Sequence, residues 1–127
     1  MENNPLISVV TVSYNAVSTI EQTILSVINQ TYPNIEYVII DGESTDGTVD
    51  VIKKYADRIT YWVSEPDKGI YDAMNKGMGI STGDFLIFIG ADDLFYTTDV
   101  IKNIVAKIKE MNVIYYCLLY TSPSPRD

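Results

Sequence analysis

Residues 85–95, FLIFIGADDLF, form a short apolar run that ends in two adjacent carboxylates, Asp92 and Asp93. The apolar part, residues 85–89, has the length and composition of a buried strand. Neighbouring carboxylates at a strand end are costly to desolvate unless a positive group lies beside them. The usual positive group is a hard metal ion that holds phosphates. The stretch therefore predicts a phosphate and metal site; the alternative is an acidic pair in a loop or a helix cap.

A second apolar run, residues 35–40, also ends in acid. It leads into Asp41 and then into a turn rich in glycine and hydroxyl groups, GESTDGT. In open α/β sheets, ligands bind in the crevice outside the carboxyl ends of the strands. We therefore expect Asp41 and the pair Asp92 and Asp93 to face one ligand. The alternative for Asp41 is a simple turn residue, because Asp and Gly favour turns.

Apolar periodicity alternates between strand and helix along the whole chain. Residues 7–13, ISVVTVS, read as the first strand, and helical spacing follows to about Gln30 with Ser18 and Glu21 as a capping box. Thr48 is expected to cap the second helix, and Thr97 or Thr98 the last one. The remaining expected strands are residues 35–40, 59–63, 85–89 and 113–116, and the remaining helix begins at residue 70. This order predicts an α/β fold with a mainly parallel sheet and helices on both faces.

Composition limits the function further. With 127 residues we expect one domain, and a net charge of −8 argues against nucleic acid or an anionic membrane as a general partner. The chain has no histidine, which removes the commonest zinc ligand and general base. The apolar stretch after Met1 is only strand-sized and lacks a basic flank, so neither a signal peptide nor a transmembrane segment is expected. No GxGxxG or GxxxxGK[ST] motif occurs, which disfavours dinucleotide redox chemistry and P-loop phosphoryl transfer.

The last residues, 117–127, break from the preceding composition. Their sequence, CLLYTSPSPRD, resembles a sequencing-library adapter translated in frame. We therefore interpret residues 1–116 as the natural part of the chain and residues 117–127 as a non-native tail that makes few contacts with the sheet. The alternative is a disordered terminus rich in Ser and Pro.

Four ordered blocks resemble one family. They are SVVTVSYN (8–15), QTYPNIEYVIIDGESTDGT (30–48), EPDKGIYDAMNKG (65–77) and STGDFLIFIGADD (81–93). In order and spacing they are similar to family 2 glycosyltransferases with the GT-A nucleotide-diphospho-sugar transferase fold, a Rossmann-like architecture. The third block is similar to bacterial members that build cell-surface polysaccharides. The resemblance covers about residues 7–116 and implies an N-terminal nucleotide-sugar-binding part whose C-terminal half is missing.

The resemblance also implies roles for four residues. Tyr14 and Asp41 would lie against the nucleotide base, with the Asp41 carboxylate accepting a base N–H. Asp92 and Asp93 occupy the place of the family's DxD motif. Asp92 would contact the ribose or the metal, and Asp93 would bind Mg²⁺ or Mn²⁺ on the diphosphate.

Three further positions complete the implied site. Asn75 matches an asparagine of the family's short helix before the DxD strand, and Lys68 or Lys76 is a candidate to approach phosphate. The alternative for all three, favoured for each lysine taken separately, is a solvated position on a helix face. The sequence departs from the family where Gly90 or Ala91 replaces the first Asp of the motif.

The implied activity is transfer of a sugar, with inversion, from a UDP or GDP donor to a saccharide or lipid-linked acceptor. The resemblance places the catalytic base well downstream of the DxD motif, so we expect no transfer by this chain alone. A cytoplasmic location is expected, with peripheral contact at the inner face of the membrane for the full-length protein. Two alternatives stay open: a receiver-like signalling domain, and a fragment that binds sugar nucleotides without catalysis.

Overall fold

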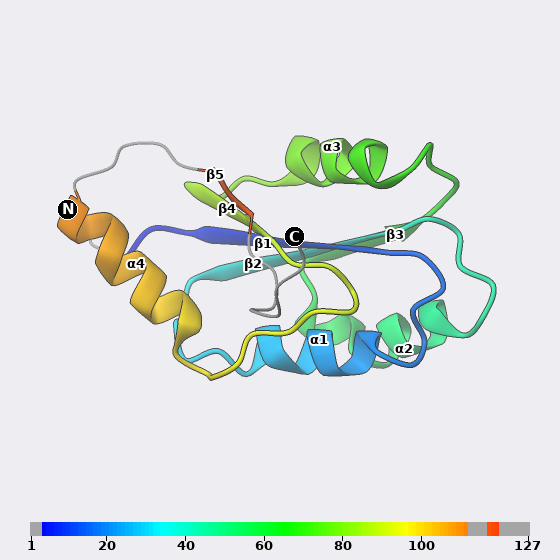
Figure 1. The fold of residues 1–127 in the computed structure, drawn as a ribbon, viewed down its shortest axis with the longest axis horizontal. Helices are drawn as coiled ribbons and strands as arrows, with labels where there is room; N and C mark the ends of the chain where they lie inside the picture. The colour runs from blue at the N-terminus through cyan, green and yellow to red at the C-terminus, as the bar shows by residue number, and fades with distance from the viewer. Residues whose placement is uncertain (1–3, 112–116, 120–127) are drawn as a thin grey trace.

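A computed structural model describes residues 4–111 and 117–119. Their core is a parallel sheet of five strands in the order β3-β2-β1-β4-β5 (Figure 1). The strands are β1 (Ile7–Ser13), β2 (Ile35–Asp41), β3 (Tyr61–Ser64), β4 (Phe85–Phe88) and β5 (Cys117–Leu119). The helices are α1 (Ile20–Ile28), α2 (Thr48–Lys54), the 3₁₀-helix η1 (Ala56–Arg58), α3 (Ile70–Ile80) and α4 (Val100–Met111). The expected alternation of strands and helices is confirmed.

Helices cover both faces of the sheet, as predicted. Helix α3 lies alone on one face, and α1, α2 and α4 lie on the other (Figure 1). Side chains alternate along each strand, so Ile7 and Val9 of β1 enter the larger core while Val10 packs toward α3. Gly77 permits this close packing, because a Cβ there would lie 2.5 Å from the Val10 side chain. Burial of each large aliphatic residue contributes roughly 1.5–3 kcal/mol to folding.

Strand β3 begins later than predicted. The expected strand was 59–63, whereas pairing with β2 starts at Tyr61 opposite Val38. The preceding residues form η1, and the Ile59 N–H donates to the Ala56 carbonyl within that turn. Ile59 is nevertheless buried in the core. Its apolar character therefore reflects burial and not strand pairing.

The predicted helix caps are wrong at the first two helices. The residue before α1 is Thr19, which makes no side-chain capping bond, and Glu21 instead accepts bonds from Tyr55 (2.5 Å) and Lys54 (3.1 Å). Thr48 is the first residue of α2 and follows Gly47, whose φ of 103° favours glycine. Tertiary partners take up both side chains, because the Thr48 hydroxyl accepts the Ala16 N–H (2.9 Å) and Glu21 is bonded from α2 and the residue after it.

The cap of α4 also comes from a distant residue. The helix begins at Val100, so neither Thr97 nor Thr98 directly precedes it. Instead, the Gln30 side chain accepts a bond from the Ile101 N–H (2.9 Å) and donates to the Thr97 carbonyl (2.7 Å). A residue just beyond α1 thus orders the start of α4.

The last described strand corrects the expectation for residues 117–127. Residues 117–119 form β5 and pair with β4 in parallel, so the prediction of few contacts with the sheet is wrong for this part. The predicted strand over 113–116 and the remainder of the tail lie outside the described residues. A non-native origin for residues 117–127 stays a prediction, which genomic sequence across residue 116 would test.

Candidate functional site

A cavity opens at the carboxyl ends of the strands. Its volume is about 690 Å³, within the usual range for small-molecule sites. The lining comes from the ends of β1 and β2, the loop after β3 and the start of α3: Val12, Ser13, Tyr14, Gly42, Glu43, Thr45, Pro66, Asp67, Gly69, Ile70 and Ala73. The cavity lies where ligands bind in open α/β sheets, as the sequence predicted.

Asp41 lies beneath this cavity and does not line it. Its side chain is fully buried and accepts four hydrogen bonds. The hydroxyls of Ser13 (2.7 Å), Ser44 (2.6 Å) and Ser64 (2.8 Å) donate three of them, and the Ser44 N–H donates the fourth (2.8 Å). Ser13 and Ser64 are the register partners of Asp41 on the strands to either side. The carboxylate therefore joins three strand ends.

This geometry gives Asp41 different partners from those expected. A carboxylate has about four acceptor positions, and these four bonds fill them. Asp41 therefore has no free lone pair directed at a base. The sequence shows that β1 and β3 both end in serine. Only the strand register, however, shows that these two serines lie beside Asp41.

The loops after β1 and β2 hold each other in place above Asp41. The Asn15 N–H donates to Ser44 Oγ (2.7 Å), and the Thr45 N–H donates to Asn15 Oδ1 (2.8 Å). Asn15 adopts a φ of 48°, a left-handed conformation that asparagine tolerates better than most residues. The Val17 N–H also donates to Asp46 (3.2 Å). The rim of the cavity is thus ordered before any ligand binds.

Tyr14 projects from this ordered rim. Its side chain is 65 % exposed and borders the cavity. An exposed aromatic ring beside a pocket suits stacking against a flat heterocycle. Its position therefore agrees with the expected base platform, a role that stays a prediction.

Asp92 and Asp93 lie at the same edge of the sheet, after β4, but neither lines the cavity. Asp93 is only 6 % exposed, yet its carboxylate has no hydrogen-bond partner among the described residues. Asp92 is exposed. A Cβ on Gly90 would lie 3.2 Å from an Asp92 carboxylate oxygen and 3.4 Å from one of Asp93, so both carboxylates approach Gly90.

Main-chain contacts hold this acidic turn. The Thr23 hydroxyl of α1 bonds to the carbonyls of Ala91 (2.9 Å) and Asp93, and the Asp93 N–H donates to the Gly90 carbonyl (3.1 Å). These bonds hold the backbone of the turn and do not involve the carboxylate groups of Asp92 and Asp93.

The pair suits a shared divalent cation. Residues 4–111 and 117–119 contain no group of three or more acidic, histidine or cysteine side chains that could hold a metal. Mg²⁺, however, is usually bound by one or two carboxylates together with substrate phosphates and water. Two carboxylates that both approach Gly90, and that make no side-chain hydrogen bond with a described residue, fit that mode.

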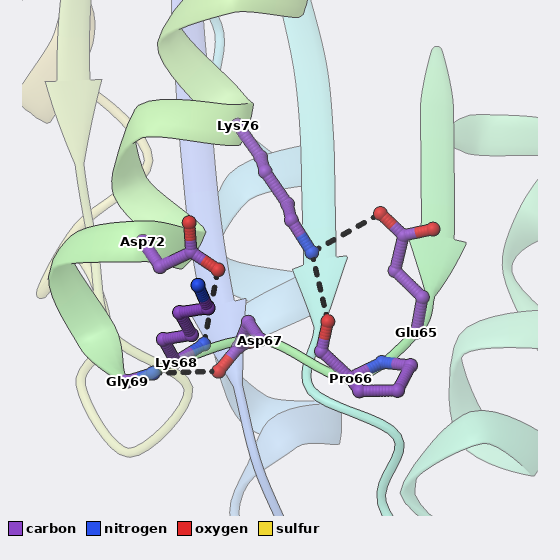
Figure 2. A network of polar contacts seen from close by, with 7 residues as sticks. All are labelled: Glu65, Pro66, Asp67, Lys68, Gly69, Asp72 and Lys76. Carbon is purple, nitrogen blue, oxygen red and sulfur yellow. Dashed lines mark hydrogen bonds and ion pairs between the residues drawn. The ribbon is translucent and has the colours of Figure 1, made fainter.

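The expected polar residues of α3 have different surroundings. Lys76 forms an ion pair with Glu65 (3.1 Å) and donates to the Pro66 carbonyl (3.0 Å), so its ammonium group braces the loop after β3 (Figure 2). The Lys68 ammonium group makes no bond with another described residue. Asn75 is exposed and does not line the cavity. Of the two lysines, Lys68 is the one left available for phosphate.

Asp67 is the residue that sequence analysis missed. One carboxylate oxygen accepts the Gly69 N–H (3.0 Å; Figure 2), and the other would lie 2.8 Å from a Cβ on Gly42. The side chain borders the cavity. Its sequence context indicated only a loop, because nothing local shows that it reaches toward the loop after β2.

The comparisons with known proteins agree with this geometry. Residues 8–126 match the family model "Glycosyl transferase family 2". The chain is 40% identical over 106 residues to an uncharacterized glycosyltransferase of Mycobacterium tuberculosis, covering 83% of this chain and 40% of that protein. It is also 40% identical over 92 residues to the Bacillus subtilis glycosyltransferase TuaG, named for teichuronic acid biosynthesis, covering 70% of this chain and 36% of TuaG. The chain thus spans less than half the length of these relatives.

Solved structures give the same result for the fold. Staphylococcus aureus TarS (residues 1–349) in complex with UDP-GlcNAc superposes with a TM-score of 0.78 at 25% identity, covering 84% of this chain and 32% of TarS. The mannosyltransferase PcManGT of Pyrobaculum calidifontis, in complex with GDP-Man and Mn²⁺, gives a TM-score of 0.76 at 28% identity, covering 82% and 32%. In residues 4–111 and 117–119 no helix is long and apolar enough to cross a membrane. The fold is the GT-A fold predicted from the sequence, and the chain belongs to glycosyltransferase family 2.

Proposed function

We propose that the protein is the nucleotide-binding part of a metal-dependent, inverting glycosyltransferase that uses a UDP or GDP sugar. The observation that carries this proposal is the pairing of an ordered cavity beside Tyr14 with two carboxylates, Asp92 and Asp93, that approach Gly90 at the same edge of the sheet. Family membership favours a transferase over a receiver-like signalling domain.

The cavity would hold the base of the nucleotide, and the acidic pair would hold its diphosphate. In this proposal Tyr14 stacks on the base, and the loops joined by Asn15 and Ser44 keep the ring in place. Asp41 supports that loop from below through its bonds to Ser44. Asn75 and Lys68 of the α3 region stay candidates for the ribose and the phosphates.

Asp92 and Asp93 would hold Mg²⁺ or Mn²⁺ against the diphosphate. The cation would stabilise negative charge that develops on the diphosphate as the bond to sugar C1 breaks. The chain itself makes such a cation necessary, because a net charge of −8 would repel a free diphosphate. The complex of PcManGT with GDP-Man and Mn²⁺ supports this pairing of nucleotide and metal.

Inversion requires a carboxylate base for the acceptor hydroxyl. We propose that this base and the acceptor site belong to the part of the longer relatives that this chain does not span. The acceptor would be a saccharide or a lipid-linked saccharide of a cell-surface polymer, an assignment supported by the name of TuaG. The location proposed for the whole protein is the cytoplasm, in peripheral contact with the inner face of the membrane.

Calorimetric titration with UDP and GDP tests the proposal. We expect binding in Mn²⁺ and none in excess chelator, and we expect Asp93→Ala to abolish the Mn²⁺-dependent part. Asp57→Asn is the matched control, because it removes an exposed carboxylate of η1 remote from the strand ends. Equal affinity with chelator would contradict the metal role. Sugar transfer by the 127-residue chain would show that the base lies within it.

A further inference from the structure

We infer that Asp67 selects the nucleotide base by accepting a base N–H in the position left open by Gly42. The inference rests on the proposed nucleotide site and names the residue that determines its base specificity. Three features support it. The Asp41 carboxylate has no acceptor position left, the Asp67 carboxylate lies close to Gly42, and the loops that carry Gly42 and Asp67 both line the cavity.

Asp41, the acceptor expected from the sequence, has no acceptor position left for a base. All four acceptor positions of Asp41 are filled by serine groups, and the residue is fully buried. The acidic residues that line the cavity are Glu43 and Asp67. Glu43 is exposed and makes no hydrogen bond with another described residue, so its position is not restrained.

Asp67, in contrast, is held in place. Its Oδ1 accepts the Gly69 N–H at 3.0 Å, which holds one oxygen of the carboxylate. Gly69 has a φ of 118°, a left-handed conformation that favours glycine, so the residue type at this position stabilises the turn. The same loop is tied to α3 through the Lys68 N–H and Asp72 (3.0 Å) and through Lys76 and the Pro66 carbonyl (3.0 Å; Figure 2).

The other oxygen of Asp67 takes the space that a side chain at residue 42 would use. Oδ2 lies 2.8 Å from the Cβ position of Gly42 and accepts no bond from another described residue. Gly42 is not among the residues with positive φ, so its backbone accepts any amino acid. Glycine is therefore needed at this position for space, and the space is occupied by the Asp67 carboxylate.

The strand order places this carboxylate at the base end of the site. Gly42 and Asp67 follow β2 and β3, whereas the acidic pair follows β4 on the other side of β1. Tyr14, the stacking candidate, follows β1 and borders the same cavity as Asp67. A nucleotide whose diphosphate meets the acidic pair would thus direct its base toward Asp67.

An ionised carboxylate can only accept hydrogen bonds. Uracil and guanine present a ring N–H on their base-pairing edge, whereas cytosine and adenine present a ring nitrogen lone pair there. At the ring nitrogen Asp67 should therefore favour UDP and GDP over CDP and ADP, whose donors lie on the exocyclic amine, by about tenfold for a well-formed contact.

Titration of UDP, GDP, CDP and ADP in saturating Mn²⁺ tests the inference. We expect the wild-type chain to prefer UDP or GDP to CDP. In Asp67→Asn the UDP-to-CDP affinity ratio should fall about tenfold, because an amide can both donate and accept. Glu43→Gln is the matched control, since it neutralises the other acidic residue of the cavity and should leave the ratio unchanged.

A variant in which residues 42 and 67 exchange their side chains tests whether the carboxylate itself, and not the local structure of one loop, sets the base preference. Gly42→Asp alone should weaken UDP binding, because two carboxylates would compete for one space. The double variant Gly42→Asp with Asp67→Gly moves the carboxylate to the opposite loop at constant charge, and it should restore the preference for UDP over CDP. Circular dichroism would confirm that each variant is folded.

Two results would overturn the inference in different ways. An unchanged UDP-to-CDP ratio in folded Asp67→Asn, with Mn²⁺-dependent binding intact, would remove the role of Asp67 and leave the proposed function standing. Absence of Mn²⁺-dependent binding of all four nucleotides to the wild-type chain would overturn the proposed function, and the inference with it.

Discussion

Asp41 and Asp93 follow the same sequence pattern but have opposite environments. Both come at or after the carboxyl end of a strand that pairs with β1, and both are nearly removed from solvent, with exposures of 0 % and 6 %. Asp41 accepts four hydrogen bonds from serine groups, whereas the Asp93 carboxylate accepts none from the described residues. The cost of burying the first charge is offset inside the protein. The second charge has no hydrogen-bond or ion-pair partner among the described residues.

The neighbouring strands explain the difference. Asp41 is still within β2 and has register partners on both sides, each of them a serine. Asp93 comes five residues after the end of β4, where strand pairing has stopped, and the bonds that hold its turn involve main-chain groups, including the Ala91 and Asp93 carbonyls. An acidic strand end is thus structural where flanking strands supply donors, and open for binding where they do not.

Removal of the Asp41 carboxylate should give the largest effect on stability. Asp41→Ala would remove a fully buried carboxylate and leave three serine hydroxyls, one buried and two partly buried, without their acceptor, and we expect the free energy of unfolding to fall by about 3 to 4 kcal/mol. Urea denaturation followed by the fluorescence of Trp62, the only tryptophan, measures this loss. Ser64→Ala removes a single donor and should cost about 1 kcal/mol. A loss below about 1 kcal/mol for Asp41→Ala would contradict the hydrogen bonding of its carboxylate by three serines.

Neutralisation of Asp93 should affect binding more than stability. Without metal, Asp93→Asn should unfold at the same urea concentration as the wild type or a higher one, because the change breaks no side-chain hydrogen bond with a described residue. Mn²⁺-dependent affinity for UDP should fall about 30-fold, or roughly 2 kcal/mol. Calorimetry and urea denaturation of one preparation measure both quantities. A large loss of stability would mean that Asp93 is structural, as Asp41 is.

Truncation of Tyr14 should give a smaller effect, confined to the base. Stacking of a base on an aromatic ring contributes roughly 1–3 kcal/mol, so Tyr14→Ala should weaken UDP binding by at least about fivefold. Tyr14→Phe keeps the ring and should bind within about twofold of the wild type. Because the side chain is 65 % exposed, neither change should alter stability. Equal losses for both variants would indicate a role for the hydroxyl group.

The smallest expected effect is a pH dependence at Asp46. A hydrogen bond from the Thr48 hydroxyl, aided by the Val17 and Thr48 N–H groups, lowers the pKa of Asp46 below its usual value. A carboxyl with a lowered pKa adds stability above its unfolded-state pKa, and this part is lost as pH falls through the folded-state pKa. The difference in unfolding midpoint between wild type and Asp46→Asn should therefore shrink as pH is lowered from 6 to about 3. A difference that does not change with pH would exclude this linkage.

Local pattern was sufficient to predict much of the fold. The central strand β1, the buried faces of α1 and α4, and the parallel α/β class all follow from apolar spacing, which reports burial along a single element. The position of acid at the ends of β2 and β4 is also a local property, and so are the four blocks that resemble family 2 glycosyltransferases.

Only the tertiary structure determined which acidic residues are free. Two of the three serine partners of Asp41 come from other strands, Gln30 reaches α4 from beyond α1, and Asp67 enters the space at Gly42 from a loop 25 positions later in the chain. Sequence patterns describe how each residue is spaced from its neighbours along one element. Hydrogen-bond saturation depends instead on strand register and loop approach, which bring together residues far apart in the chain. For that reason the sequence by itself indicated a nucleotide-binding edge, and the folded chain decided which of its carboxylates can meet a ligand.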